Sequence, residues 1–159
     1  MGIFNPYDRF LKISEISEEY LEREGICALI LDVDNTLTEH NSHNISEEVA
    51  LWIEEMRQKN IKLIIVSNNS EERVEPFSEK VNIPFIARGK KPLAKGINKA
   101  VKALGVPKEK VMLIGDQIFT DVLGGKFSKV KTILLEPISP EEEGFLKFKR
   151  VLENKLKLR

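Results

Sequence analysis

The sequence has little cysteine, no long apolar run and no net charge. Its 159 residues include one cysteine, so no intrachain disulfide can form, and a reducing cytoplasm fits that composition. No run reaches the roughly 18 apolar residues of a membrane span, and the start lacks a signal-peptide pattern. Lys plus Arg and Asp plus Glu number 25 each, so no general attraction to polyanions is expected. We therefore predict a single domain over residues 1–159, cytoplasmic or peripheral to a membrane, with an N-terminal arm over about 1–24.

Apolar runs alternate along the chain with segments of helical periodicity. This alternation predicts an α/β fold, a Rossmann-like three-layer sandwich around a central parallel sheet. The carboxyl ends of parallel strands meet at one edge, where ligands bind. Cys27 falls in the first apolar run, which favours a core role over a reactive thiol. The predicted strands cover about 26–31, 61–66, 83–87, 110–114 and 131–135, and the predicted helices cover about 46–59, a segment from Ser70 that bends or breaks at Pro76, and 92–104.

The run Asp32-Val33-Asp34-Asn35-Thr36 follows the first apolar strand. Two carboxylates so close cannot both sit ionised in a dry cleft without a cation or a shared proton. The run is therefore a Mg²⁺ site, a nucleophile with its acid partner, or a solvated turn. A calcium loop is excluded, because Leu37 and His43 stand where that loop needs Gly and Glu.

Three further polar clusters come after the other predicted strands. Four clusters gathered at one sheet edge favour a shared site over four unrelated turns. The three clusters are Ser67-Asn68-Asn69, Lys90-Lys91-Pro92 and Gly115-Asp116 with Asp121.

In this order the residues resemble the haloacid dehalogenase (HAD) superfamily of phosphohydrolases. Ser67-Asn68-Asn69, Lys91-Pro92 and the run from Gly115 to Gly125 further resemble the small YqeG-type branch of its subfamily IIIA. Proteins of that branch are similar to phosphatidylglycerophosphatases. The resemblance extends from about Phe4 to the region of Phe148.

The resemblance implies a role for each acidic residue. Asp32 would attack phosphorus and become an aspartyl phosphate. Asp34 would protonate the leaving alkoxide and then deprotonate water. Asp32, the backbone carbonyl of Asp34, and Asp116 would bind Mg²⁺, the implied cofactor. Asp121 would hold water or a lysine in place. The alternative is that it is a first-turn carboxylate that satisfies the free amides at the start of a helix.

The phosphoryl oxygens would be bound by hydroxyl, amide and ammonium groups. The resemblance assigns this role to Thr36, Ser67, Asn68 and Lys91. Lys90 is the rival of Lys91, but Lys91 directly precedes Pro92, as in the family pattern. Pro92 suits the first position of a helix, with the preceding residue extended.

The motif spacing leaves no room for an inserted cap domain. Residues 38–66 must supply a helix and a strand, and so must the stretch between Asn69 and Lys91. The resemblance therefore implies a capless HAD fold with an open site, unless an oligomeric partner or the loop over residues 38–45 covers it. Open sites suit a lipid head group, a protein or a nucleic-acid end.

Two other segments could contact a ligand or a surface. Residues 141–157 predict a basic amphipathic helix, which could lie on an anionic membrane; packing on the domain with solvated charges is the commoner outcome. His40 and His43 are interpreted as polar loop residues at the mouth of the site, because no thiol or third histidine accompanies them.

The preferred function is a Mg²⁺-dependent phosphomonoester hydrolase that converts phosphatidylglycerophosphate to phosphatidylglycerol. The first alternative is a phosphatase of soluble sugar, nucleotide or protein phosphates. The second is a non-catalytic binding protein, which usually lacks one of the paired aspartates; Asp32 and Asp34 are both present. No basic and aromatic platform for nucleic acid is found.

Overall fold

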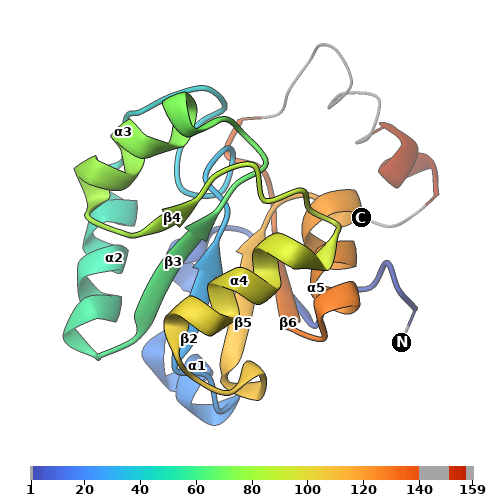
Figure 1. Cartoon of the computed structure of the whole chain (residues 1–159), viewed down its shortest axis with the longest axis horizontal. Coiled ribbons are helices and arrows are strands. Elements are labelled where there is room, and N and C mark those ends of the chain that lie inside the picture. The colour runs from blue at the N-terminus through green and yellow to red at the C-terminus, as the bar shows by residue number, and fades with distance from the viewer. Residues whose placement is uncertain (1, 140–150, 157–159) are drawn as a thin grey trace.

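A six-stranded parallel sheet forms the centre of the computed structural model, which describes residues 2–139 and 151–156. The strand order is β1-β6-β5-β2-β3-β4, and every neighbouring pair is parallel (Figure 1). The strands are β1 (Asp8–Phe10), β2 (Ala28–Leu31), β3 (Lys62–Val66), β4 (Phe85–Ile86), β5 (Val111–Gly115) and β6 (Lys131–Leu135).

Helices cover both faces of this sheet, which confirms the predicted three-layer α/β sandwich. α1, α2 and α3 pack on one face, and α4 and α5 pack on the other (Figure 1). The helices are α1 (Glu18–Arg23), α2 (Glu47–Gln58), α3 (Glu71–Val81), α4 (Ala94–Leu104) and α5 (Leu123–Ser128). Three short helical turns complete the fold: η1 (Ile13–Glu15), η2 (Lys108–Lys110) and η3 (Ile118–Val122), of which η3 is a π-helix that leads directly into α5.

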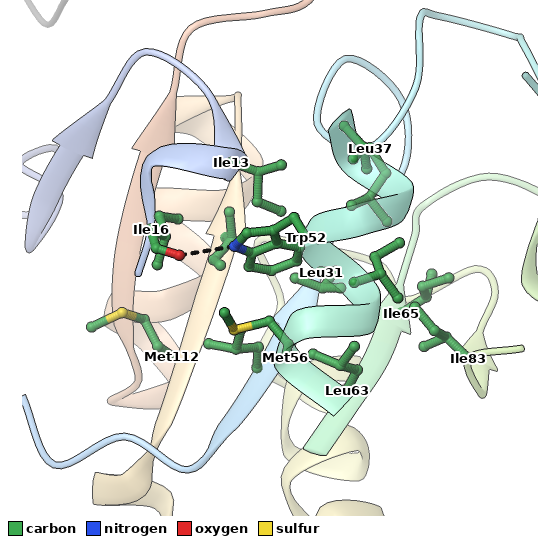
Figure 2. Packing of buried hydrophobic residues seen from close by; sticks show 14 of the residues in the cluster. Ile13, Ile16, Leu31, Leu37, Trp52, Met56, Leu63, Ile65, Ile83 and Met112 are labelled. Atoms are coloured by element: carbon green, nitrogen blue, oxygen red, sulfur yellow. Dashed lines mark hydrogen bonds between the residues drawn. The ribbon is translucent and has the colours of Figure 1, made fainter. Parts of the chain in front are cut away.

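The alternation of side chains along β2 divides the core in two. Leu29 and Leu31 belong to the cluster under α2 and α3, whereas Ala28 and Ile30 belong to the cluster under α4. Both sets are fully buried, so β2 is apolar on both faces, as expected for a central parallel strand. Figure 2 shows the first cluster around Trp52, whose indole Nε1 donates a 2.8 Å hydrogen bond to the carbonyl of Ile16.

The starts of the helices differ in part from the predicted ones. Ser46 caps α2 as expected, because its hydroxyl accepts the amide of Val49 at 3.2 Å. α3 runs through Pro76 without the predicted break, since Phe77, with its neighbours on the same face, is fully buried against the sheet and offsets the lost backbone bond. α4 begins at Ala94, two residues later than predicted, with Leu93 as its N-cap.

Both ends of the chain contribute to the structure. Part of the predicted N-terminal arm forms β1, which pairs with β6 at the edge of the sheet. Of the predicted tail helix, residues 151–155 are helical, and residues 141–150 and 157 lie outside the described residues. Across the described ranges, no helix combines the length and the apolar character needed to span a membrane.

Candidate active site

The polar clusters come together at the carboxyl ends of the central strands. Asp32 directly follows β2, Ser67 follows β3, and Asp116 follows β5, while Lys91 lies between β4 and α4. Asp32, Ser67 and Lys91 line a cleft of about 170 Å³ together with neighbouring residues, whereas Asp116 does not line it. Its lining consists of Asp32, Asp34, His40, Ser67, Asn68, Asn69, Lys91, Gln117 and Thr120.

No cap domain is inserted beside this cleft in residues 2–139. The chain between β2 and β3 holds only a loop and α2, and the chain between β3 and α4 holds α3, β4 and short loops. The fold is therefore capless, as expected. The cleft is smaller than the ~300 Å³ at which pockets for whole small molecules begin, so it has the size for a phosphoryl group rather than a complete ester.

Lys91 lies at the centre of the buried charges. Its ammonium Nζ lies 2.6 Å from Asp121 Oδ1 and 3.3 Å from Asp32 Oδ1, and its side chain is only 2% exposed. Gly115 permits this arrangement, because a Cβ there would stand 2.2 Å from the carboxyl carbon of Asp121. Lys90, the rival lysine, is exposed and does not line the cleft.

Burial and charge act in opposite directions on this pair. Burial raises the pKa of Asp32 well above its usual value; Lys91 lowers it, and the charges of Asp121 and Asp116 raise it further. Burial lowers the pKa of the Lys91 ammonium, but the charges of Asp121 and Asp32 outweigh that effect and leave the pKa raised. Lys91 is thus a charged cation, and further positive charge beside Asp32 would lower the pKa of that carboxyl group.

Three buried carboxylates could supply the ligands for such a positive charge. Oxygens of Asp32, Asp116 and Asp121 all lie within 4.8 Å of one another. The Lys91 ammonium contacts two of these acids, Asp32 and Asp121, so the charge of one ammonium is shared between two carboxylates. Hard oxygen ligands of this kind suit Mg²⁺, and the residues present therefore fit a divalent cation.

Asp34, the second acid of the first motif, has a different environment. Arg73 Nη2 donates to its Oδ1 at 2.8 Å, Asn69 Nδ2 donates to its Oδ2 at 2.6 Å, and the amide of Asn41 donates to Oδ1 at 2.8 Å. Arg73 also donates to the carbonyl of Ser42 at 2.7 Å. These donors direct the Asp34 side chain away from the acidic cluster. Its predicted contribution to a metal site was through its backbone carbonyl, and that role stays a prediction.

Sequence reasoning did not assign roles to Arg73 and Asn69. Asn69 lies in the loop just before α3 and Arg73 lies in the first turn of that helix. The motif Ser67-Asn68-Asn69 was noted, but nothing in the sequence indicated that Arg73 would reach Asp34. Gln117 and Thr120 line the cleft and were also not predicted.

The predicted phosphate-binding residues differ in what they face. Ser67 lines the cleft and its Oγ accepts the amide of Asn69 at 3.1 Å, so its hydroxyl proton remains available to donate. Asn68 pairs with the backbone of Lys91 through both amide atoms, at 2.7 and 2.9 Å, and so fixes that lysine. Thr36 lies outside the cleft, and its hydroxyl is 3.5 Å from Asp116 Oδ1. Its direct phosphate contact stays a prediction.

The two loop histidines have separate positions. His40 lines the cleft, with Nδ1 4.0 Å from Asp34 Oδ1. The backbone carbonyl of His43 accepts a hydrogen bond from Lys80 Nζ at 3.0 Å, and this residue does not line the cleft. They do not form a paired metal site with the three acids.

Comparison with known proteins agrees with this site. A family model described as haloacid dehalogenase-like hydrolase matches residues 8–135. The chain is 41% identical over 150 residues to the Bacillus subtilis (strain 168) protein named "Probable phosphatase YqeG", covering 94% of this chain and 87% of that protein. It is 27% identical to the Arabidopsis thaliana protein "Phosphatidylglycerophosphate phosphatase 1, chloroplastic/mitochondrial", covering 89% of this chain but 43% of that longer protein.

A solved structure shares the fold at lower identity. The cobalt-bound deoxy-D-mannose-octulosonate 8-phosphate phosphatase of Haemophilus influenzae superposes with a TM-score of 0.53 and 17% identity, covering 85% of this chain and 90% of that one. The similarity of that protein supports the fold alone. The family match and the close Bacillus relative show that this chain belongs to the haloacid dehalogenase-like hydrolases, as a phosphatase of the YqeG type.

Proposed function

We propose that this phosphatase is Mg²⁺-dependent, works through an aspartyl phosphate on Asp32, and acts on phosphatidylglycerophosphate. The observation that supports the mechanism most strongly is the contact of Asp32 with the buried ammonium of Lys91, at 3.3 Å, beside two further acids. In the proposed mechanism Asp32 is the nucleophile and Lys91 is its charge partner, and both residues line the same cleft.

The first half-reaction transfers the phosphoryl group to the enzyme. A carboxylate oxygen of Asp32 forms a bond to phosphorus, and the bond from phosphorus to the ester oxygen breaks. Lys91 balances the charge of the transferring group, and the Ser67 hydroxyl donates to one of its oxygens. The leaving alkoxide takes a proton from Asp34, which lines the same cleft. General acid help of this kind is worth about 10²–10⁴-fold.

The second half-reaction returns Asp32 to its free state. Asp34 removes a proton from water, the water oxygen bonds to phosphorus, and the bond from phosphorus to Asp32 breaks. The hydrogen bonds that Asp34 receives from Arg73, Asn69 and the Asn41 amide hold its carboxyl group in place for these proton transfers. Inorganic phosphate then leaves.

A divalent cation would be held by Asp32 and Asp116, with Asp121 close by. When bound, it would neutralise the excess negative charge of these acids and of the phosphate. The Thr36 hydroxyl lies 3.5 Å from Asp116 Oδ1 and would help to orient that ligand.

The lipid substrate is supported by three observations. A relative at 27% identity is named a phosphatidylglycerophosphate phosphatase, although this chain covers less than half of it. The small capless cleft accepts a phosphoryl group while leaving the rest of a bulky substrate outside. The third observation is an exposed apolar side chain beside the first motif. Ile138 is 46% exposed, and its amide donates to the carbonyl of Asn35 at 3.2 Å.

Contact with a membrane follows from this substrate. The chain has no helix to span a bilayer in its described parts, so a lipid head group would be reached from the membrane surface. The basic tail, with Lys and Arg at alternating positions near its end, is the proposed contact. All residues that line the cleft belong to one chain, so the proposed mechanism needs no second copy.

The test is phosphate release with Mg²⁺ from phosphatidylglycerophosphate in mixed micelles, beside soluble sugar, nucleotide and protein phosphates. We expect a lipid preference of at least tenfold in kcat/KM, and no release by Asp32→Asn. Turnover of soluble esters alone would keep the mechanism and overturn the lipid substrate. Undiminished turnover by Asp32→Asn would overturn the mechanism. The binding-protein alternative is disfavoured by family membership and by the presence of both motif acids.

A further inference from the structure

The helix that follows Asp116 begins without a cap from its own neighbourhood. η3 and α5 form one continuous helical segment over residues 118–128, and Gln117, its N-cap residue, makes no capping hydrogen bond with its side chain. The amide of Gln117 itself donates to Asp121 Oδ2 at 3.1 Å. The amide of Ile118 is the next donor, and the first amides of a helix have no partner within the helix.

A residue of the C-terminal tail supplies the missing acceptor. Glu153 Oε1 accepts the amide of Ile118 at 3.1 Å, across 35 positions of sequence. The Glu153 residue is 1% exposed. Glutamate is almost never fully buried unless it has a partner, and a carboxylate is favoured at the amino end of a helix. Figure 1 shows residues 151–155 (red) at the end of the molecule where the carboxyl ends of the strands lie.

Four groups of the candidate site lie on the segment held by Glu153 or directly before it. Asp116 precedes it, Gln117 and Thr120 line the cleft, and Asp121 bonds to the ammonium of Lys91 at 2.6 Å. Ile118 itself is fully buried, so its amide has no access to water as an alternative partner. Loss of the Glu153 acceptor would therefore leave a buried donor unsatisfied at the start of this segment.

We propose that Glu153 is a positioning residue for the phosphatase reaction: it fixes residues 117–122 and thereby sets the places of Asp116 and Asp121. The short helical stretch over residues 151–155 is then a structural support of the active site. This inference rests on the proposed roles of Asp32, Lys91 and Asp116, but the hydrogen bond that carries it does not depend on the identity of the substrate.

The experiment compares Glu153→Leu and Glu153→Gln with the wild-type full-length chain. Leucine has a similar volume and no acceptor, whereas glutamine keeps a carbonyl acceptor without the charge. Asn154→Ala, a change at the exposed position next to Glu153, is the matched control for a substitution in this part of the chain. Two quantities are measured: amide hydrogen exchange of residues 117–122, and the Mg²⁺ concentration that gives half-maximal hydrolysis of 4-nitrophenyl phosphate.

We expect Glu153→Leu to speed exchange of residues 117–122 and to raise the half-saturating Mg²⁺ concentration, each by about tenfold. Glu153→Gln should stay within about threefold, and Asn154→Ala should match the wild type. Unchanged exchange in Glu153→Leu would overturn the inference. Faster exchange with unchanged Mg²⁺ dependence would also overturn it, because the segment would then be ordered without positioning the site.

Failure of the proposed function gives a different pattern. If the wild type hydrolyses no phosphatidylglycerophosphate, the lipid assignment fails while both measurements on Glu153 proceed with the synthetic ester. If Glu153→Leu does not fold, Glu153→Asp replaces it, because aspartate is shorter by one methylene and keeps the acceptor. This variant should show a smaller change in the same direction. Amide exchange of residues 117–122 at the wild-type rate in Glu153→Asp would contradict the inference.

Discussion

The environment of Asp32 disfavours the ionised form of its side chain. Burial and two acidic neighbours raise its pKa, and Lys91 offsets only part of that effect. A carboxylate at this position is therefore strained in the metal-free protein, and the strain is relieved by a cation or by a proton. Residues of this kind are often replaceable with a gain in stability and a loss of function.

Asp32→Asn should separate these two effects. We expect hydrolysis to fall by about 10³-fold or more, because asparagine cannot form the aspartyl phosphate. We expect Tm of the metal-free protein to rise by about 2–4 °C, equivalent to about 1 kcal/mol, since one buried negative charge is removed. Calorimetry in EDTA measures the second effect. A lower Tm in the variant would show that the contact of Asp32 with Lys91 outweighs the repulsion.

Arg73→Ala should impair the reaction without weakening substrate binding. Arg73 joins Asp34 to the carbonyl of Ser42 and does not line the cleft. We expect kcat to fall by about 10–100-fold, a part of the ~10²–10⁴-fold value of a general acid–base, with KM little changed. Arg73→Lys should also fail, because an ammonium cannot reproduce the two directed bonds.

Arg57→Ala is the matched control for this prediction. Arg57 likewise joins two elements, through the carbonyls of Val81 and Asn82 at the end of α3, but lies away from the cleft. Its loss should lower Tm and leave kcat unchanged. An Arg73→Ala enzyme with wild-type kcat, or with a change in KM alone, would contradict the positioning of Asp34 by Arg73.

At the scale of elements, the strands were the most predictable part of the fold. Apolar runs with polar ends identified β2, β3, β5 and β6, and the edge rule then brought Asp32, Ser67, Lys91 and Asp116 together. The three-residue β1 was not predicted, because Asp8-Arg9-Phe10 carries no apolar periodicity and is fixed by pairing with β6.

Contacts between distant helices were beyond the reach of local patterns. The bond from Arg73 to Asp34 and the bond from Ile118 to Glu153 each join residues about 35 or more positions apart. Both depend on how segments that are distant in the sequence pack together, which is a tertiary property. The continuity of α3 through Pro76 has the same origin, since packing of the helix outweighed a local propensity.

Gly115→Ala tests the packing of β5 against the segment that follows it. The new Cβ would lie 2.2 Å from both the carboxyl carbon and Oδ2 of Asp121, a fully buried residue bonded to Lys91. We expect a loss of about 1–3 kcal/mol in the free energy of unfolding and a large loss of activity, because Asp121 must move. Chemical denaturation and phosphate release measure the two.

Gly124→Ala is the control glycine variant, placed nine residues further along the chain. There the nearest atom to a new Cβ is the end of the Ile97 side chain, at 2.9 Å, which can shift. Its effect on activity should be much smaller. Equal losses in the two variants would show that general crowding, and not displacement of Asp121, is responsible.

At the scale of the whole molecule, stability should depend on pH and metal together. Because the folded-state pKa of Asp32 is raised, the folded metal-free protein binds more protons than the unfolded chain above about pH 4, the ordinary Asp range. Its free energy of unfolding therefore falls as pH rises from that value toward the raised pKa. A cation bound to the ionised acids reverses this loss.

Saturating Mg²⁺ should accordingly raise Tm more at pH 8 than at pH 5. A concentration of 100 times Kd adds about 2.7 kcal/mol, equivalent to about 5–10 °C for a chain of this size. Thermal unfolding at the two pH values, with and without EDTA, measures the difference. Equal shifts at both pH values, or none, would count against a metal site formed by Asp32 and Asp116.

The proposed mechanism passes through an aspartyl phosphate on Asp32, and this covalent intermediate can be trapped. The enzyme is mixed with a ³²P-labelled phosphomonoester, quenched in acid within one turnover and digested. The aspartyl-phosphate mechanism predicts a hydroxylamine-sensitive label on the peptide that contains Asp32, and none in Asp32→Asn. Label on a different residue, or hydrolysis by Asp32→Asn at the wild-type rate, would contradict this mechanism.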